Sequence, residues 1–275
     1  MNPVPAWLMR RSKGAAAPLR LARVLLSTQY ATMLEYRAEI ALWALSGVIP
    51  FLMFGLWSQL PGAAPSLAGP LLARYFVAVF VVRQFTLAWV AWAFEDDHLQ
   101  GRLAPYLLQP LHPLWRYLCA HLAEQATRLP FTLLIAGVFL ALQPQAIGAP
   151  NPAQWLGGLV AVELAFALNF LLQSLVAILC FWTERATALD RLLYTPFFFL
   201  SGLVAPLDTF PDWLHRLALC TPFPLVIDFP ARLLAGAPVG VISGFALQLL
   251  WIGLLLPLVI GCWRLGVRRY GAMGA

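Results

Sequence analysis

Long, nearly uncharged apolar stretches restrict what this chain can fold into more than any other feature. A helix needs about 20 apolar residues to cross roughly 30 Å of hydrocarbon, whereas a barrel strand alternates over about ten residues. The chain is 61% hydrophobic and only 11% charged, and its mean hydropathy is +0.77. In soluble proteins, charged residues alone make up about a quarter of the sequence. The sequence therefore predicts an all-α integral membrane protein.

The apolar stretches predict about six membrane-spanning helices within a single domain of residues 1–275. The expected spans are residues 40–60, 71–94, 114–142, 152–182, 192–207 and 240–263. The fifth span is short, and the third and fourth are long enough to tilt or to protrude into water. An alternative count draws the proline-rich segment 208–238 into the membrane as a broken hairpin.

Basic residues predict the orientation of the spans, because short loops rich in Lys and Arg stay in the cytoplasm. Arginines precede the first span and occur in the second-to-third connection, the fourth-to-fifth connection and the C-terminal tail, whereas the opposite side carries only Arg216 and Arg232. Both termini are therefore expected in the cytoplasm, with the chain in the cytoplasmic (inner) membrane. The net charge of +6 indicates orientation and contact with anionic membrane lipid, and no nucleic-acid partner is expected.

Residues 1–38 are expected to form a cytoplasmic arm followed by an interfacial helix. From Pro18 onward, apolar residues recur at three- and four-residue spacing, which is typical of an amphipathic helix. Arg20 and Arg23 occupy a neighbouring face that could meet lipid headgroups. The alternative is an early cytoplasmic extension of the first span.

The segment 208–238 is the longest connection expected on the external side. Its prolines divide it into short pieces, among which residues 212–220 and 228–234 are expected to form small helices. No soluble domain and no internal repeat are visible in the sequence.

Catalysis by this chain is not expected. A Walker phosphate-binding loop needs a lysine directly after its final glycine, but Lys13, which follows Ser12, is the single lysine of the sequence. The histidines show no metal-binding spacing and no metal site is expected. If ATP and Mg²⁺ power the protein, they bind to another polypeptide, and this chain needs no cofactor of its own.

Two charged residues inside expected spans call for an explanation, because an unpaired charge in a membrane usually faces a cavity or a partner. Arg83 in the second span and Glu163 in the fourth each lie roughly 17 Å from the external side at 1.5 Å per residue. We expect them to form a pair that clasps the two helices. The alternative places Arg83 and Glu163 on the path of a substrate or proton.

The charged segment 95–113 connects the second and third spans. Gly101 permits a close backbone approach, and Pro105, Pro110 and Pro113 limit how a short helix there can continue. An apolar side that includes Tyr106 would be unfavourable in water unless another subunit or the membrane surface covered it. The pattern predicts a compact, ordered element rather than a plain loop.

Several segments of the chain, in their order and placement, resemble the membrane subunit of ABC exporters of the ABC-2 type. These are the basic N-terminal helix, Arg37-Ala-Glu39, the segment 95–113 with its Gly-x-Leu and Leu-x-x-Pro steps, Phe181-Trp-Thr-Glu184, Phe199-Leu-Ser-Gly202 through Pro206, Phe210-Pro-Asp-Trp213 and Thr221-Pro-Phe223.

The resemblance implies an export permease whose segment 95–113 is a cytoplasmic coupling helix seated on a separate ABC ATPase. It also implies short external re-entrant helices after the fifth span and a second permease subunit, identical or different. The residues that would contact the ATPase are Leu99, Gly101, Arg102, Tyr106 and Leu107. The expected cargo is amphipathic, lipid-like or drug-like. The alternative function is an ion-coupled secondary transporter or channel that uses Arg83 and Glu163 directly.

Overall fold

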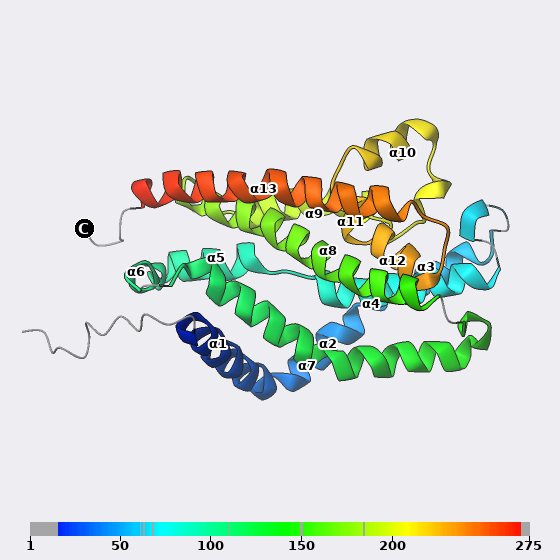
Figure 1. The fold of residues 1–275 in the computed structure, drawn as a ribbon, viewed down its shortest axis with the longest axis horizontal. Coiled ribbons are helices and arrows are strands. Elements are labelled where there is room, and N and C mark those ends of the chain that lie inside the picture. Colours follow the sequence, from blue (N-terminus) through cyan, green and yellow to red (C-terminus); the bar gives the residue numbers. More distant parts are fainter. Residues whose placement is uncertain are drawn as a thin grey trace, which may run out of the picture.

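The computed structural model describes residues 16–60, 62, 64–67, 69–109, 111–148, 151–183 and 185–270. These residues form helices and connections without a β-strand, arranged as an elongated bundle (Figure 1). The all-α prediction is confirmed. Residues 1–15 of the expected arm, together with Pro110 and Glu184, lie outside the described residues.

Five helical segments in the described residues are long and apolar enough to cross a membrane. They are Arg37–Trp57, which comprises α2 (Arg37–Ser46) and α3 (Ile49–Trp57); Pro70–Leu99, which comprises α4 (Pro70–Thr86) and α5 (Val90–Leu99); α7 (Pro113–Leu142); Pro152–Phe181, which comprises α8 (Pro152–Ile178) and η4 (Leu179–Phe181); and α13 (Val241–Arg269). They correspond to the expected first, second, third, fourth and sixth spans.

The second of these segments differs from its prediction in two respects. It continues five residues past Phe94 to Leu99, and it is interrupted at residues 87–89, between α4 and α5. The charged residues Glu95, Asp96 and Asp97 therefore belong to a helix that continues the span and do not begin a separate loop. Only the short α6 (Leu103–Leu107) follows before α7.

The expected fifth span is a shorter helix than predicted. Helix α9 (Thr187–Leu200) has 14 residues, so it rises about 21 Å and falls short of the roughly 30 Å of hydrocarbon. It ends before residue 207 because the chain turns through residues 201–206 to the 3₁₀ helix η5 (Leu207–Thr209). The chain then reaches α10 at the opposite end of the bundle from α6 (Figure 1).

The proline-rich segment after α9 forms the small helices that its sequence predicts. These are α10 (Asp212–Leu219), α11 (Phe223–Val226) and α12 (Asp228–Ala235). Helix α12 packs against α4 and α8, and nearly all of its side chains are buried. Part of the segment 208–238 therefore packs inside the bundle, and its placement in the membrane as a broken hairpin stays a prediction.

Helix α1 (Ala16–Glu35) confirms the helix expected from Pro18 onward. It packs against the α6 end of α7 and is inclined to the bundle axis (Figure 1). The residue Tyr36 separates it from α2, so it does not continue the first span as one straight helix.

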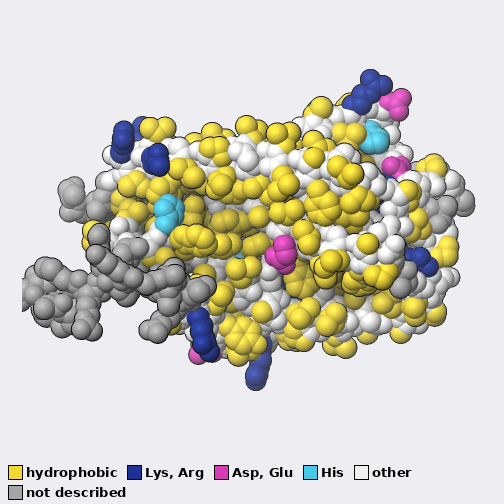
Figure 2. Space-filling view, in the orientation of Figure 1, with side chains coloured by type: hydrophobic (Ala, Val, Ile, Leu, Met, Phe, Trp, Pro, Cys, Tyr) yellow, Lys and Arg dark blue, Asp and Glu magenta, His cyan; other side chains and the backbone are white. Residues whose placement is uncertain are grey.

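Buried side chains form two main clusters along the bundle. One surrounds Tyr75 and Phe76 of α4 together with α8, α11 and α12, and the other surrounds Phe94 of α5 together with the ends of α8 and α13. The break between α4 and α5 falls where one cluster passes into the other. Figure 2 shows an outer face that is hydrophobic along most of its length, with basic side chains mainly toward its ends, as expected for a protein surrounded by lipid.

Candidate functional site

The segment 95–113, predicted to be the coupling segment, is held together by its own charges. Gly101 has a φ of +71°, a left-handed conformation that favours glycine, and it reverses the chain between α5 and α6. Arg102 donates from Nε to the Asp97 carboxylate at 2.6 Å and pairs with Asp96. The hydroxyl of Tyr117 in α7 donates to the other Asp97 oxygen at 2.7 Å. These contacts join α5, α6 and α7 into one rigid unit.

The charge on Arg102 is therefore already compensated inside the segment. Hydrogen bonds to Asp97 and Asp96 raise the pKa of Arg102 above its ordinary value. The ring of Tyr106 is also engaged, since the Arg116 guanidinium lies 4.0 Å from its centroid. Of the five residues expected to meet an ATPase, Arg102 and Tyr106 thus serve partly to shape the segment.

The exposed apolar side chains of the segment belong to other residues. The Leu99 side chain is 41% exposed, Leu108 is 88% exposed and Leu103 is fully buried. Leu107 and Gly101 are half-buried. Leu108 is exposed but was not among the five residues expected to contact an ATPase, although it directly follows Leu107 in the same apolar run.

A second set of contacts connects α5 to the beginning of α9. The Glu95 carboxylate accepts from the backbone N–H of Thr187 at 2.7 Å and from its hydroxyl at 3.0 Å. Trp92 donates from Nε1 to Asp190 at 3.0 Å, and Gln173 of α8 donates to the other Asp190 oxygen at 2.6 Å. Glu95 and Asp190 are both buried, so these contacts join α5 firmly to α9.

The break between α4 and α5 leaves backbone groups without helical partners, and side chains from neighbouring helices bind them. The carbonyl groups of Gln84, Phe85 and Thr86 accept from Arg128, Gln125 and Asn169, respectively, at 3.0, 2.5 and 2.8 Å. The N–H of Trp89 donates to His121 Nε2 at 2.6 Å, and that of Ala91 donates to Gln173 at 3.4 Å. Irregular backbone at membrane depth is tolerated where protein groups satisfy it in this way.

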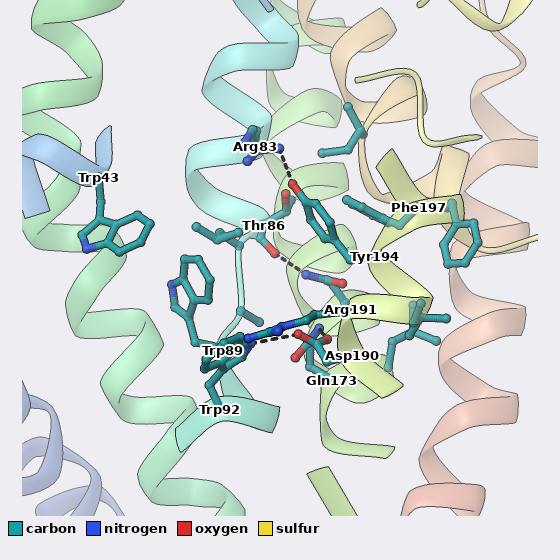
Figure 3. Close-up of a pocket in the computed structure, with 17 residues that line it drawn as sticks. Trp43, Arg83, Thr86, Trp89, Trp92, Gln173, Asp190, Arg191, Tyr194 and Phe197 are labelled. Carbon is teal, nitrogen blue, oxygen red and sulfur yellow. Dashed lines mark hydrogen bonds between the residues drawn. The ribbon is translucent and has the colours of Figure 1, made fainter. Parts of the chain in front are cut away.

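A pocket with a cavity volume of about 370 Å³ lies beside this break (Figure 3). Its walls come from α2, from α4 and α5 on either side of the break, and from α8, α9 and α11. The Arg83 guanidinium donates to the Tyr194 hydroxyl at 3.2 Å. The Arg191 guanidinium lies 5.2 Å from the Trp92 ring centroid. Such a volume lies within the range of about 300–1,000 Å³ typical of ligand pockets.

The expected Arg83–Glu163 pair is not formed. Arg83 lines the pocket, whereas Glu163 is exposed on the outer side of α8. The spacing within each span placed both residues at a similar depth but did not fix which side of its helix each one occupies. The local Glu124–Arg128 pair four residues apart in α7 is present, and its Arg128 also binds the helix break.

A buried polar network at the other end of the bundle was not recognised from the sequence. Asp228 of α12 accepts from the Tyr75 hydroxyl at 2.7 Å and from Arg232 Nε at 2.8 Å. Arg232 also donates to Asp208 and to Ser66, both at 3.1 Å. The i,i+4 spacing of Asp228 and Arg232 is the signal that could have indicated the pair. The network fixes α12 to α4 and to η5.

The described residues contain no group of three or more His, Cys, Asp or Glu side chains that could hold a metal ion. Together, the long apolar helices and the broken helix with its pocket define a multi-pass helical membrane protein with an internal pocket.

A family comparison gives this class a more specific identity. Residues 71–274 match the family described as ABC-2 family transporter protein. The match covers most of the chain, so the protein belongs to this family and is an ABC transporter permease. Membership implies pairing with a separate ABC ATPase. A comparison with curated proteins gives no match.

Proposed function

We propose that this chain is the permease of an ATP-driven exporter that moves an amphipathic, lipid-like or drug-like substrate out of the cytoplasm. ATP and Mg²⁺ would bind to the partner ATPase. The contacts between the coupling segment, α9 and the pocket are the observation that supports this proposal.

The distribution of charge over the bundle supports the proposed orientation. The α6 end carries Arg102 and Arg185 in its connections, Arg116 in the first turn of α7, and Arg268 and Arg269 at the end of α13. Because basic loops stay in the cytoplasm, this end would face the cytoplasm of a cytoplasmic (inner) membrane. The α10 end would face outward, and both termini would be cytoplasmic.

A movement of the ATPase would reach the pocket through α6, α5 and α9. The rigid α5–α6 unit carries the exposed Leu99 and Leu108, and it holds α9 through Glu95 and Trp92. The same helix α9 contributes Tyr194 to the pocket wall. Displacement of α6 by the ATPase would therefore move α9 relative to α4 and change the pocket. Packed elements with discrete arrangements transmit small displacements in this way.

The experiment is co-expression and co-purification of the full chain with a candidate partner ABC ATPase from the same organism, followed by measurement of ATP hydrolysis. Leu108→Asp and Leu99→Asp place charge on the proposed contact surface, and we expect them to weaken the complex. Leu219→Asp is the matched control, because Leu219 is 58% exposed on α10 at the opposite end. A complex that tolerates both coupling-segment variants as well as it tolerates Leu219→Asp would refute the coupling assignment.

Glu95→Gln separates coupling from assembly. Glu95 is buried behind the contact surface, so the complex should form, whereas substrate stimulation of ATP hydrolysis should decrease because the α5–α9 connection is weaker. Unchanged stimulation would show that force does not pass through α9.

A second permease subunit is a further part of the proposal. The exposed apolar side chains of α9, including Leu192 and Phe199, could contact either that subunit or lipid. The alternative of an ion-coupled transporter or channel required Arg83 and Glu163 to act together. It is not favoured, because Glu163 lies outside the pocket that contains Arg83.

A further inference from the structure

The pocket beside the helix break carries an excess of positive charge. Its charged lining residues are Arg83, Arg191 and Asp190. Both Asp190 oxygens already accept hydrogen bonds, from Trp92 and Gln173. Within the part of the chain that the structure describes, neither guanidinium has a carboxylate within ion-pair distance. The pocket therefore contains two guanidinium groups and one carboxylate, and that carboxylate is already hydrogen-bonded to Trp92 and Gln173.

This excess is unfavourable without a ligand. Arg83 lies near the middle of the segment Pro70–Leu99, where a charged side chain is costly and normally faces a cavity or a partner. Its contact with the neutral hydroxyl of Tyr194 supplies no opposite charge. An anionic group bound near Arg83 would supply it.

A large part of the remaining pocket wall is aromatic. Trp43 and Trp89 lie in T-shaped contact with ring centroids 5.5 Å apart, and Trp92, Tyr194 and Phe197 also line the pocket, together with aliphatic and amide side chains (Figure 3). Arg191, Tyr194 and Phe197 follow one another at three-residue spacing, so they occupy one face of α9. Such walls favour a flat apolar body, whereas guanidinium groups favour carboxylate, sulfonate or phosphate.

We propose that this pocket binds an amphipathic organic anion, attracted by the positive charge of Arg83 and Arg191, with the tryptophan rings around its apolar body. The proposal that this ligand is also the transported substrate rests on the export function proposed above. The proposal that the pocket binds it does not depend on that function. The same chemistry is offered by a soluble anionic amphiphile and by an anionic lipid headgroup.

The test uses the full chain in phosphatidylcholine nanodiscs without any ATPase. Equilibrium dialysis compares 2-naphthalenesulfonate with the similarly shaped, neutral 2-naphthalenesulfonamide, and protein-free discs give the background. We expect the sulfonate to bind at least about tenfold more tightly. Arg83→Gln and Arg191→Gln should each weaken sulfonate binding about tenfold or more, with little effect on the sulfonamide.

Two further variants control for general effects. Arg216→Gln removes a charge from α10, outside the pocket, and should leave the preference for the sulfonate unchanged. Arg83→Lys keeps the positive charge and should retain part of the preference for the sulfonate. If Arg83→Gln does not fold, Arg191→Gln decides, because Arg191 is exposed. Equal binding of the two probes, or a preference that survives loss of both arginines, would overturn the proposal.

Discs that contain phosphatidylglycerol distinguish the two ligand sources. Competition with the sulfonate identifies a lipid headgroup as the occupant, and unchanged sulfonate binding identifies a soluble amphiphile. Charge-selective binding in the discs, combined with failure of the chain to form a complex with an ABC ATPase in co-purification, would refute the export function but keep the site. An intact, coupled complex without charge selectivity would refute the site alone.

Discussion

The Glu95 carboxylate binds both donors of Thr187, with the backbone N–H at 2.7 Å and the hydroxyl at 3.0 Å. Thr187 is the first residue of α9, where backbone N–H groups lack helical partners and the helix dipole favours a negative charge. A residue of one helix thus stabilises the beginning of another, far along the chain.

Glu95→Ala should lower the stability of the protein. The substitution leaves the Thr187 N–H without its acceptor, and losing such a contact at a helix start costs about 1–2 kcal/mol. Thermal unfolding of the purified chain in detergent measures the change. Asp96→Ala is the control, because the neighbouring Asp96 pairs with Arg102 in a solvent-exposed position and such pairs contribute little. Equal effects of the two variants would contradict this prediction.

Asn169→Leu should destabilise the helix break. Asn169 donates to the Thr86 carbonyl at 2.8 Å, and a leucine of similar size leaves that carbonyl unpaired, at a cost of about 1–3 kcal/mol. Resistance to denaturation by SDS measures the loss. Gln145→Leu removes an exposed amide whose side-chain bond within the described residues is to Gln143, and it should have little effect. A comparable loss there would mean that the break is not the cause.

Gly244→Ala and Gly253→Ala should have opposite effects, although both lie in α13. A Cβ atom at Gly244 would lie 1.9 Å from the ring of Phe229 in α12, whereas none of the neighbouring atoms lies within 4 Å of one at Gly253. Displacement of this buried ring costs about 1–3 kcal/mol, whereas Ala in place of Gly in a helix gains up to about 1 kcal/mol. Melting temperatures in detergent compare the two, and two equal shifts would argue against the packing of α12 on α13.

Asp228→Ala should be the most damaging change at the α10 end. It removes the acceptor of Tyr75 and Arg232, and breaking a buried ion pair from one side costs about 3–5 kcal/mol. Asp208→Ala should cost less, because Arg232 would keep Asp228. Size-exclusion chromatography, which gives the yield of monodisperse protein, and the melting temperature test this order. A larger loss of stability from Asp208→Ala than from Asp228→Ala would contradict the prediction.

Features that depend on neighbouring residues could be predicted from the sequence, whereas features that depend on distant residues could not. Hydropathy located five of the spans because lipid requires long apolar helices, and the prolines of the segment 208–238 located α10 and α12 because proline ends helices locally. The break at residues 87–89 has no local signal, since no proline or glycine lies there. Its partners Gln125, Arg128 and Asn169 are 40 or more residues away along the chain.

The sequence by itself determined that this chain is a helical membrane protein, where most of its helices lie and which short segment is rigid and charged. Hydropathy, helix length and proline geometry depend on neighbouring residues, so a sequence displays them directly. The tertiary structure decided that Glu95 binds Thr187, that Arg83 faces Tyr194 and not Glu163, and that a pocket lies beside a broken helix. These relationships depend on how each helix is rotated and which helices pack together, because the side chains that meet belong to distant parts of the chain.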